Sequence, residues 1–98
     1  MKILALEREL SEATTEQFQQ YGKEEALRVW ELYQQGVIRE LYFRQDRSEA
    51  VLMLECDGVD EAEAVLQTLP LVKAGLITFE LIPLVAYPGF TRLFSIAR

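Results

Sequence analysis

Residues 37–56 read VIRELYFRQDRSEAVLMLEC, and this stretch predicts two β-strands separated by a short polar connection. Residues 37–44 alternate in polarity, so one strand face carries Val37, Arg39, Leu41 and Phe43. The other face carries Ile38, Glu40, Tyr42 and Arg44. Residues 50–56 are apolar almost throughout, which indicates that both faces of the second strand are covered. The short QDRSE connection favours an antiparallel hairpin.

Helix and strand signals on either side of this hairpin complete the fold prediction. Residues 2–7 predict a strand, and Thr14 with Gln17 has the spacing of a capping box that starts a helix over residues 15–35, with Gly36 as its stop. Asp60 with Glu63 has the same spacing, and Pro70 ends that second helix. Residues 77–87 predict the last strand. The order βαββαβ predicts an α+β, ferredoxin-like sandwich.

The chain of 98 residues is expected to form one domain, residues 1–98, with residues 88–98 as a tail that packs on the sheet or on a partner subunit. Two helices cover only one face of a four-stranded sheet. Because the strand at residues 50–56 is apolar on both sides, we expect the sheet face that the helices leave open to be covered by the same face of a second copy. A homodimer or higher homo-oligomer, and a dimeric α/β barrel, are therefore predicted.

Composition limits the possible chemistry and partners. A net charge of −6 argues against nucleic-acid binding, and the sequence shows neither a signal peptide nor a membrane-spanning apolar run. One cysteine and no histidine argue against a zinc or haem site with the usual ligands and exclude histidine acid–base chemistry. We therefore expect a cytoplasmic protein without a metal, whose partner is a small molecule.

Glu25 is the first candidate site residue. On a helical wheel it lies beside Phe18 and Val29, within the apolar stripe of the first helix, whereas Glu24 points away from it. A carboxylate in such a stripe is paired, hydrogen-bonded or held neutral by a raised pKa, and a raised pKa suits a general acid or base. The sequence leaves open whether Glu25 is catalytic or belongs to a structural ion pair.

Arg39 and a group of strand residues are the other candidates. Arg39 shares a predicted face with apolar side chains, so it either clamps a substrate carboxylate or neutralises Glu25. A set of polar residues on two strands would line a substrate pocket if these side chains face a dimer interior, or would form an ordinary hydrated sheet surface if they face solvent. This set comprises Glu40, Tyr42, Arg44, Thr78 and Glu80.

Several segments resemble the muconolactone isomerase family, within the dimeric α/β-barrel group. The similar positions are Glu25, Leu32, Gly36, Arg39, Leu41, LQTLPL at residues 66–71, FELIPL at residues 79–84 and Tyr87-Pro88. The resemblance implies a cofactor-independent isomerase that moves a proton in a small unsaturated lactone or carboxylic acid. It implies that Glu25 carries the proton and that Arg39 holds the acid group of the substrate. The chain differs in having no histidine, with Glu40 and Arg47 near the places of the family's histidines.

Two alternatives stand beside the isomerase. One is a cofactor-free monooxygenase built on the same barrel. The other is a non-catalytic oligomeric protein that binds a small molecule. A non-catalytic module would pair Glu25 with Arg39 and leave no cavity beside them, whereas an enzyme should have a pocket next to both side chains.

Overall fold

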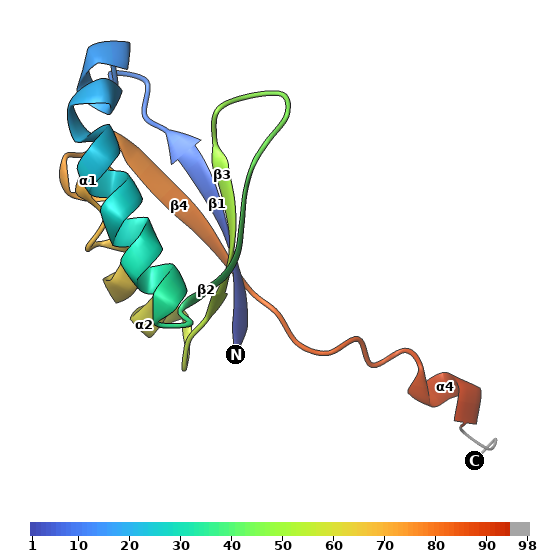
Figure 1. Ribbon diagram of the computed structural model, residues 1–98. Helices are drawn as coiled ribbons and strands as arrows, with labels where there is room; N and C mark the ends of the chain where they lie inside the picture. Colours follow the sequence, from blue (N-terminus) through green and yellow to red (C-terminus); the bar gives the residue numbers. More distant parts are fainter. Residues whose placement is uncertain (95–98) are drawn as a thin grey trace.

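The computed structural model describes residues 1–94, which form four strands and four helices (Figure 1). In chain order the elements are β1 (Lys2–Glu9), α1 (Thr15–Gln34), β2 (Ile38–Phe43), β3 (Ala50–Glu55), α2 (Val59–Leu66), α3 (Pro70–Lys73), β4 (Ile77–Pro83) and α4 (Thr91–Phe94). The α+β composition predicted from the sequence is confirmed. No helix within residues 1–94 combines the length and the apolar character needed to span a bilayer.

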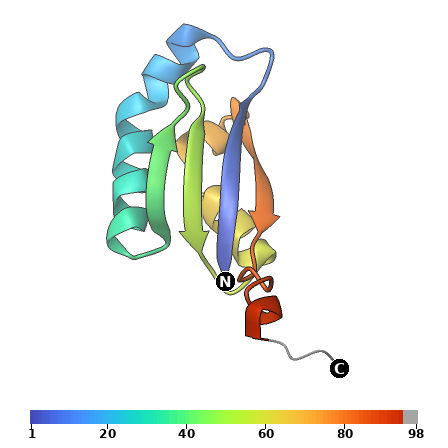
Figure 2. The same cartoon turned by 90° about the vertical axis from the view of Figure 1, so that its right-hand side faces the viewer.

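The strands form one antiparallel sheet in the order β2-β3-β1-β4. Helices α1, α2 and α3 all lie against the same face of this sheet, and no helix of residues 1–94 covers the opposite face (Figures 1 and 2). Both central strands, β1 and β3, therefore have one face in the core and one face open. This arrangement is compatible with a ferredoxin-like fold.

The start and end of α1 follow the predicted capping chemistry. The Thr14 hydroxyl accepts a hydrogen bond from the Gln17 amide, and the Gln17 side chain accepts one from the Thr14 amide, so both halves of the capping box are present. After the helix, Gly36 adopts φ +79°, a left-handed conformation that glycine tolerates without a steric penalty. The helix is thus held at both ends by local sequence signals.

The segment between β3 and β4 differs from the prediction. The N-cap of α2 is Gly58, so Asp60 lies inside the first turn of the helix and does not form the predicted capping box. Pro70 does not merely end a helix, because it occupies the first turn of α3, where its fixed φ and missing N–H are tolerated. Strand β4 stops at Pro83, short of residue 87.

The buried core lies between the helices and the sheet. Ile3, Leu32, Ile38, Leu54 and Leu69 are its largest fully buried side chains, and they come from three strands, α1 and the segment before α3. Burial of large aliphatic side chains contributes about 1.5–3 kcal/mol each. These contacts fix α1 and α2 against the sheet.

A β-bulge at Arg39 changes the faces of β2. Ile38 pairs with Leu54, but Glu40 pairs with Met53, so Arg39 is an extra residue without a partner on β3. Strict alternation predicted Arg39 on the same face as Leu41 and Phe43, and this prediction is wrong. Ile38, Leu41 and Phe43 share the helix-covered face instead.

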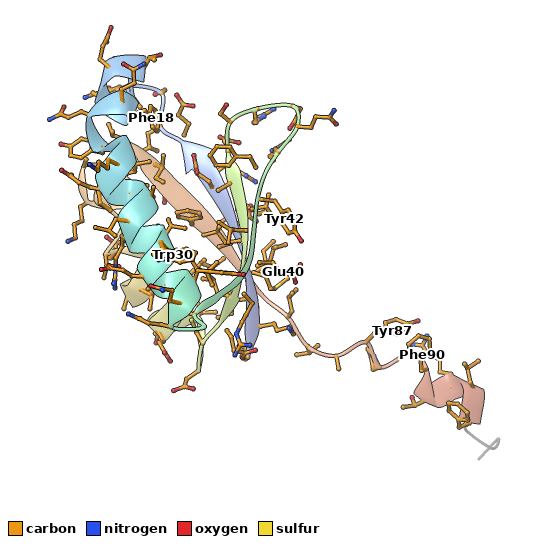
Figure 3. The ribbon with its side chains drawn as sticks, in the orientation of Figure 1. Phe18, Trp30, Glu40, Tyr42, Tyr87 and Phe90 are labelled. Carbon is orange, nitrogen blue, oxygen red and sulfur yellow. The ribbon has the colours of Figure 1, made fainter. Side chains whose placement is uncertain are left out.

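The C-terminal tail runs away from the sheet up to residue 94 (Figures 1 and 3). It ends in the short helix α4, and the rings of Tyr87 and Phe90 meet edge to face with centroids 5.1 Å apart. Both rings are about two-thirds exposed. The tail was expected to pack on the sheet or on a partner subunit, and the described part does not pack on its own sheet. Residues 95–98 lie outside the described residues.

Candidate functional site

A cavity of about 460 Å³ lies between the middle of α1 and the sheet. We call it the Glu25 pocket. Its wall is mostly apolar, which is typical of small-molecule sites of this size. The lining residues are Glu7, Gly22, Glu25, Ala26, Val29, Leu41, Tyr42, Phe43, Ala50, Leu52, Leu69, Leu71 and Phe79. The exposed side chain of Phe43 and the exposed backbone of Gly22 mark the opening of the pocket between β2 and α1.

Glu25 is one of two acidic side chains on this wall. Its Oε1 accepts a hydrogen bond of 2.9 Å from the backbone amide of Leu71, in the first turn of α3. Burial raises the pKa of the Glu25 carboxyl, and the Leu71 hydrogen bond opposes this rise only in part. The wheel therefore placed Glu25 correctly, half-buried on the apolar side of α1, and Glu24 is exposed as expected.

Glu7 is the second acidic side chain of the pocket, and the sequence analysis missed it. It lies on the same strand face as the fully buried Ile3 and Ala5, and it is only 7% exposed. Burial raises the pKa of its carboxyl, and the nearby charges of Glu49, Glu25 and Glu9 raise it further. Alternation from Ile3 through Ala5 puts residue 7 on the inward face, and residue 7 lies within the predicted strand, so this signal could have revealed Glu7.

The pairing of β1 with β3 changes character next to Glu7. The regular register ends at Leu6 and Val51, and beyond it carboxylates replace carbonyls as acceptors. Glu7 Oε1 accepts from the Ala50 amide at 3.1 Å, and Glu49 Oε2 accepts from the Glu9 amide at 2.9 Å. Two buried carboxylates thus sit where the strands separate, directly behind the pocket.

The other oxygen of Glu49, Oε1, is buried and accepts no hydrogen bond from residues 1–94. Its charge is balanced at longer range, by Arg44 at 3.8 Å and Arg47 at 3.9 Å. These two arginines come from the β2–β3 hairpin. They lie on the solvent side of the acidic cluster, so no arginine of the hairpin reaches the pocket side, where Glu7 and Glu25 line the wall.

Arg39 does not line the Glu25 pocket. The bulge turns its side chain back toward the end of α1, where Nε donates a 2.7 Å hydrogen bond to the Gly36 carbonyl. Its guanidinium also lies 3.8 Å from the position that a Cβ would take on Gly36. The structure therefore does not bring Glu25 and Arg39 together, either as an ion pair or around one cavity.

The remaining predicted site residues are distributed over the open side of the sheet and the hairpin. The Tyr42 hydroxyl donates to Glu40 at 3.0 Å on the side of β2 away from α1, which raises the pKa of Tyr42, although Tyr42 also borders the pocket (Figure 3). Arg44 forms a two-pronged contact with Asp46. Glu80 pairs with Arg8 at 3.0 Å. Of these residues, only Tyr42 contacts the pocket.

A smaller cavity of about 240 Å³ lies beyond the first, between α2, α3 and β4. Phe79 lines both cavities, from the inward face of β4. Its register partner on β1 is Glu7. The Phe79 ring therefore stands beside Glu7 and forms part of the wall between the two cavities.

No group of three His, Cys, Asp or Glu side chains within residues 1–94 is arranged to hold a metal ion. Comparison with protein-family models and with curated proteins finds no match to this chain. Functional interpretation therefore depends on the geometry of the Glu25 pocket.

Proposed function

We propose that this protein is a cofactor-independent isomerase that moves a proton within a small unsaturated lactone, with Glu25 as the proton carrier. The observation that supports this most directly is a half-buried carboxyl of raised pKa on the wall of a mainly apolar cavity. A carboxyl with a raised pKa holds a proton more readily than a free carboxyl does, which suits a group that takes up and returns a proton. The Leu71 amide binds Oε1, so Oε2 is the oxygen that can face a ligand.

The proposed reaction requires one base and no external reactant. The Glu25 carboxylate removes a proton from the carbon between the lactone carbonyl and the double bond. The C–H electron pair moves into a conjugated dienolate. Glu25 then returns the proton to the far end of this system, so one C–H bond is broken, another is formed and the double bond shifts into conjugation. Glu7 could hold a proton next to the dienolate oxygen, because burial and neighbouring charges also raise its pKa.

Proton NMR in D₂O tests this proposal directly. A β,γ-unsaturated butenolide such as α-angelica lactone should be converted to its conjugated isomer with deuterium at the newly protonated carbon. Glu25→Gln should abolish conversion, and Glu24→Gln is the matched control, because Glu24 is adjacent but exposed. Full conversion by folded Glu25→Gln would contradict the proposal. For the related monooxygenase alternative, the readout is oxygen uptake during turnover.

A non-catalytic binding protein is the second candidate, and one observation favours it. The Glu25–Leu71 hydrogen bond joins α1 to α3, so Glu25 also has a structural reason to be where it is. The pocket would then serve only to hold a ligand. Ligand binding that survives Glu25→Gln unchanged, without any turnover by the wild type, would favour this second function.

The fold and assembly that belong to this proposal are a ferredoxin-like βαββαβ subunit and a homodimer. The open face of the sheet supports the dimer, because no helix within residues 1–94 covers it and its apolar residues are only half-buried (Figure 2). We call this surface the open sheet face. Its apolar members are Leu4, Leu6, Val51, Met53 and Ile82. A second copy would cover it and would also offer a surface to the tail residues Tyr87 and Phe90.

A further inference from the structure

The charged groups of the Glu25 pocket all have the same sign. Glu7 and Glu25 are both acidic, and neither a lysine nor an arginine within residues 1–94 lines the cavity. The arginines of the neighbouring elements are held elsewhere. Arg8 binds Glu80, Arg28 binds Thr68 and Glu31, and Arg39 binds the Gly36 carbonyl. A ligand in this pocket would therefore meet acidic groups and hydrocarbon, without a cation.

Binding of an anionic ligand in such a site would include two unfavourable free-energy terms. The ligand would lose its hydration on entering an apolar cavity, and each carboxyl that it approached would either repel it as a charge or first have to take up a proton. Glu7 is the more buried of the two carboxyls, because it is 7% exposed and lies beside Glu49 and Glu9. An uncharged ligand avoids both terms and can accept a hydrogen bond from a protonated carboxyl.

We infer that the Glu25 pocket selects an uncharged, largely hydrocarbon substrate with one carbonyl or hydroxyl group, and that Glu7 and Glu25 together exclude carboxylates. This inference deepens the proposed function and rests on it for the identity of the site. It removes the carboxylic acid from the two substrate classes implied by the family resemblance. It also explains why the pocket lacks an arginine clamp, since an uncharged substrate does not need one.

Shape supports the same substrate class. The apolar lining includes Leu41, Phe43, Leu52 and Phe79, which offer flat and branched hydrocarbon surfaces. A ring compound could place its body against these side chains and its one polar group toward Glu7 and Glu25. A volume of about 460 Å³ is within the range of pockets that enclose drug-sized ligands.

A matched series of naphthalene probes tests the inference by isothermal titration calorimetry at pH 7.5. 1-Naphthol is uncharged at this pH, 1-naphthoate is an anion and 1-naphthylmethylamine is a cation. We expect 1-naphthol to bind and 1-naphthoate to bind weaker by about tenfold or more. In the Glu7→Gln/Glu25→Gln variant the charges disappear while side-chain acceptors remain, so the difference should shrink to about threefold or less.

Four results would overturn the inference. They are equal binding of naphthol and naphthoate, tighter binding of the amine than of naphthol, an unchanged difference in the double variant, and no binding of naphthol. The inference and the proposed function fail separately. Selective naphthol binding without isomerisation of any butenolide would contradict only the proposed function. Glu25-dependent turnover of a carboxylate substrate would contradict only the inference.

Discussion

The Glu25 carboxylate on α1 accepts the amide hydrogen of Leu71 on α3, with 2.9 Å between Oε1 and N. The N-cap position of α3, Leu69, has no side chain that can accept such a bond. A side chain from another helix therefore satisfies an amide in the first turn of α3. The same carboxylate faces the pocket, so a structural task and a proposed chemical task meet in one residue.

These two tasks can be separated by comparing two substitutions of Glu25. Glu25→Gln keeps an oxygen that can accept from Leu71, so its free energy of unfolding should not fall below that of the wild type, while isomerisation is lost. Glu25→Ala leaves the Leu71 amide without this acceptor and should lower the free energy of unfolding by about 1–3 kcal/mol. Urea denaturation with the NMR assay checks both results. Equal destabilisation by Gln and Ala would show that the hydrogen bond is not the structural contribution.

Glu7→Gln is expected to stabilise the protein at neutral and alkaline pH. The folded-state pKa of Glu7 is raised, so the folded state binds its proton more tightly than the unfolded chain does. The unfolded carboxyl has a pKa near 4.5, and the cost of ionising Glu7 in the fold grows from that pH up to its folded pKa. Glutamine does not bear this cost. The difference in unfolding free energy, variant minus wild type, should rise with pH above 4.5 and then level off.

Urea titrations of wild type and Glu7→Gln from pH 4 to pH 9 measure this difference. The comparison cancels the contributions of other groups, such as Asp46 and Glu55, whose pKa values are lowered by their ion pairs. A difference that falls with rising pH would mean that the charged form of Glu7 is favoured by the fold, contrary to its environment.

Gly22 is expected to control access to the pocket. A Cβ built on this residue has no atom within 4 Å, and glycine inside a helix costs about 0.5–1 kcal/mol relative to alanine. Gly22→Ala should therefore stabilise the protein by about that amount and leave naphthol binding intact. Gly22→Leu should fill the opening and weaken naphthol binding by about tenfold or more. Binding by Gly22→Leu that equals wild-type binding would place the probe, or the opening, elsewhere.

Arg39→Ala should change substrate binding by less than about twofold. The Arg39 side chain is exposed, donates to the Gly36 carbonyl and lies outside the pocket wall. The family resemblance predicts the opposite result, namely that Arg39→Ala causes a large loss of substrate affinity. Measuring KM for the butenolide, or Kd for naphthol, decides between them, with naphthol binding by Gly22→Leu as the positive control for a change in the pocket.

The open sheet face should lose its self-association when a charge is placed at its centre. Val51→Asp would bury an unpaired carboxylate in the proposed dimer, which should raise the dimer Kd by about two orders of magnitude, or about 3 kcal/mol. Leu27→Asp is the matched control, since Leu27 is 60% exposed on the far side of α1. Sedimentation velocity measures both variants, with circular dichroism to confirm folding. Dissociation by Leu27→Asp alone would move the interface to the helical layer.

The sequence predicted those parts of the structure whose signals are local. The capping box fixed the start of α1, and helical periodicity then placed Glu25 toward the sheet and Glu24 toward water. Each of these predictions depends on residues within a few positions of one another.

The sequence could not predict the features that depend on pairing between distant segments. The bulge at Arg39 exists only relative to β3, so alternation along β2 alone could not locate it. For Glu7, alternation along β1 gives the inward position, but the partner of its carboxylate is distant in sequence. The carboxylate accepts the Ala50 amide, 43 residues away. The start of α3 has, in contrast, a local signal, because proline is favoured in the first turn of a helix and Pro70 occupies that position.

The bulge acts like a shift of reading frame within the sheet. One residue without a partner decides which side chains of β2 face the helices and which face outward. Strict pairing that placed Arg39 opposite Met53 would turn Glu40 and Tyr42 inward and rotate Leu41 and Phe43 out of the pocket wall. Deleting Arg39 would have no such effect, because Glu40 already lies opposite Met53 and the inward residues would keep their partners. The one extra residue thus keeps an apolar binding wall on a strand whose own alternation would make that wall polar.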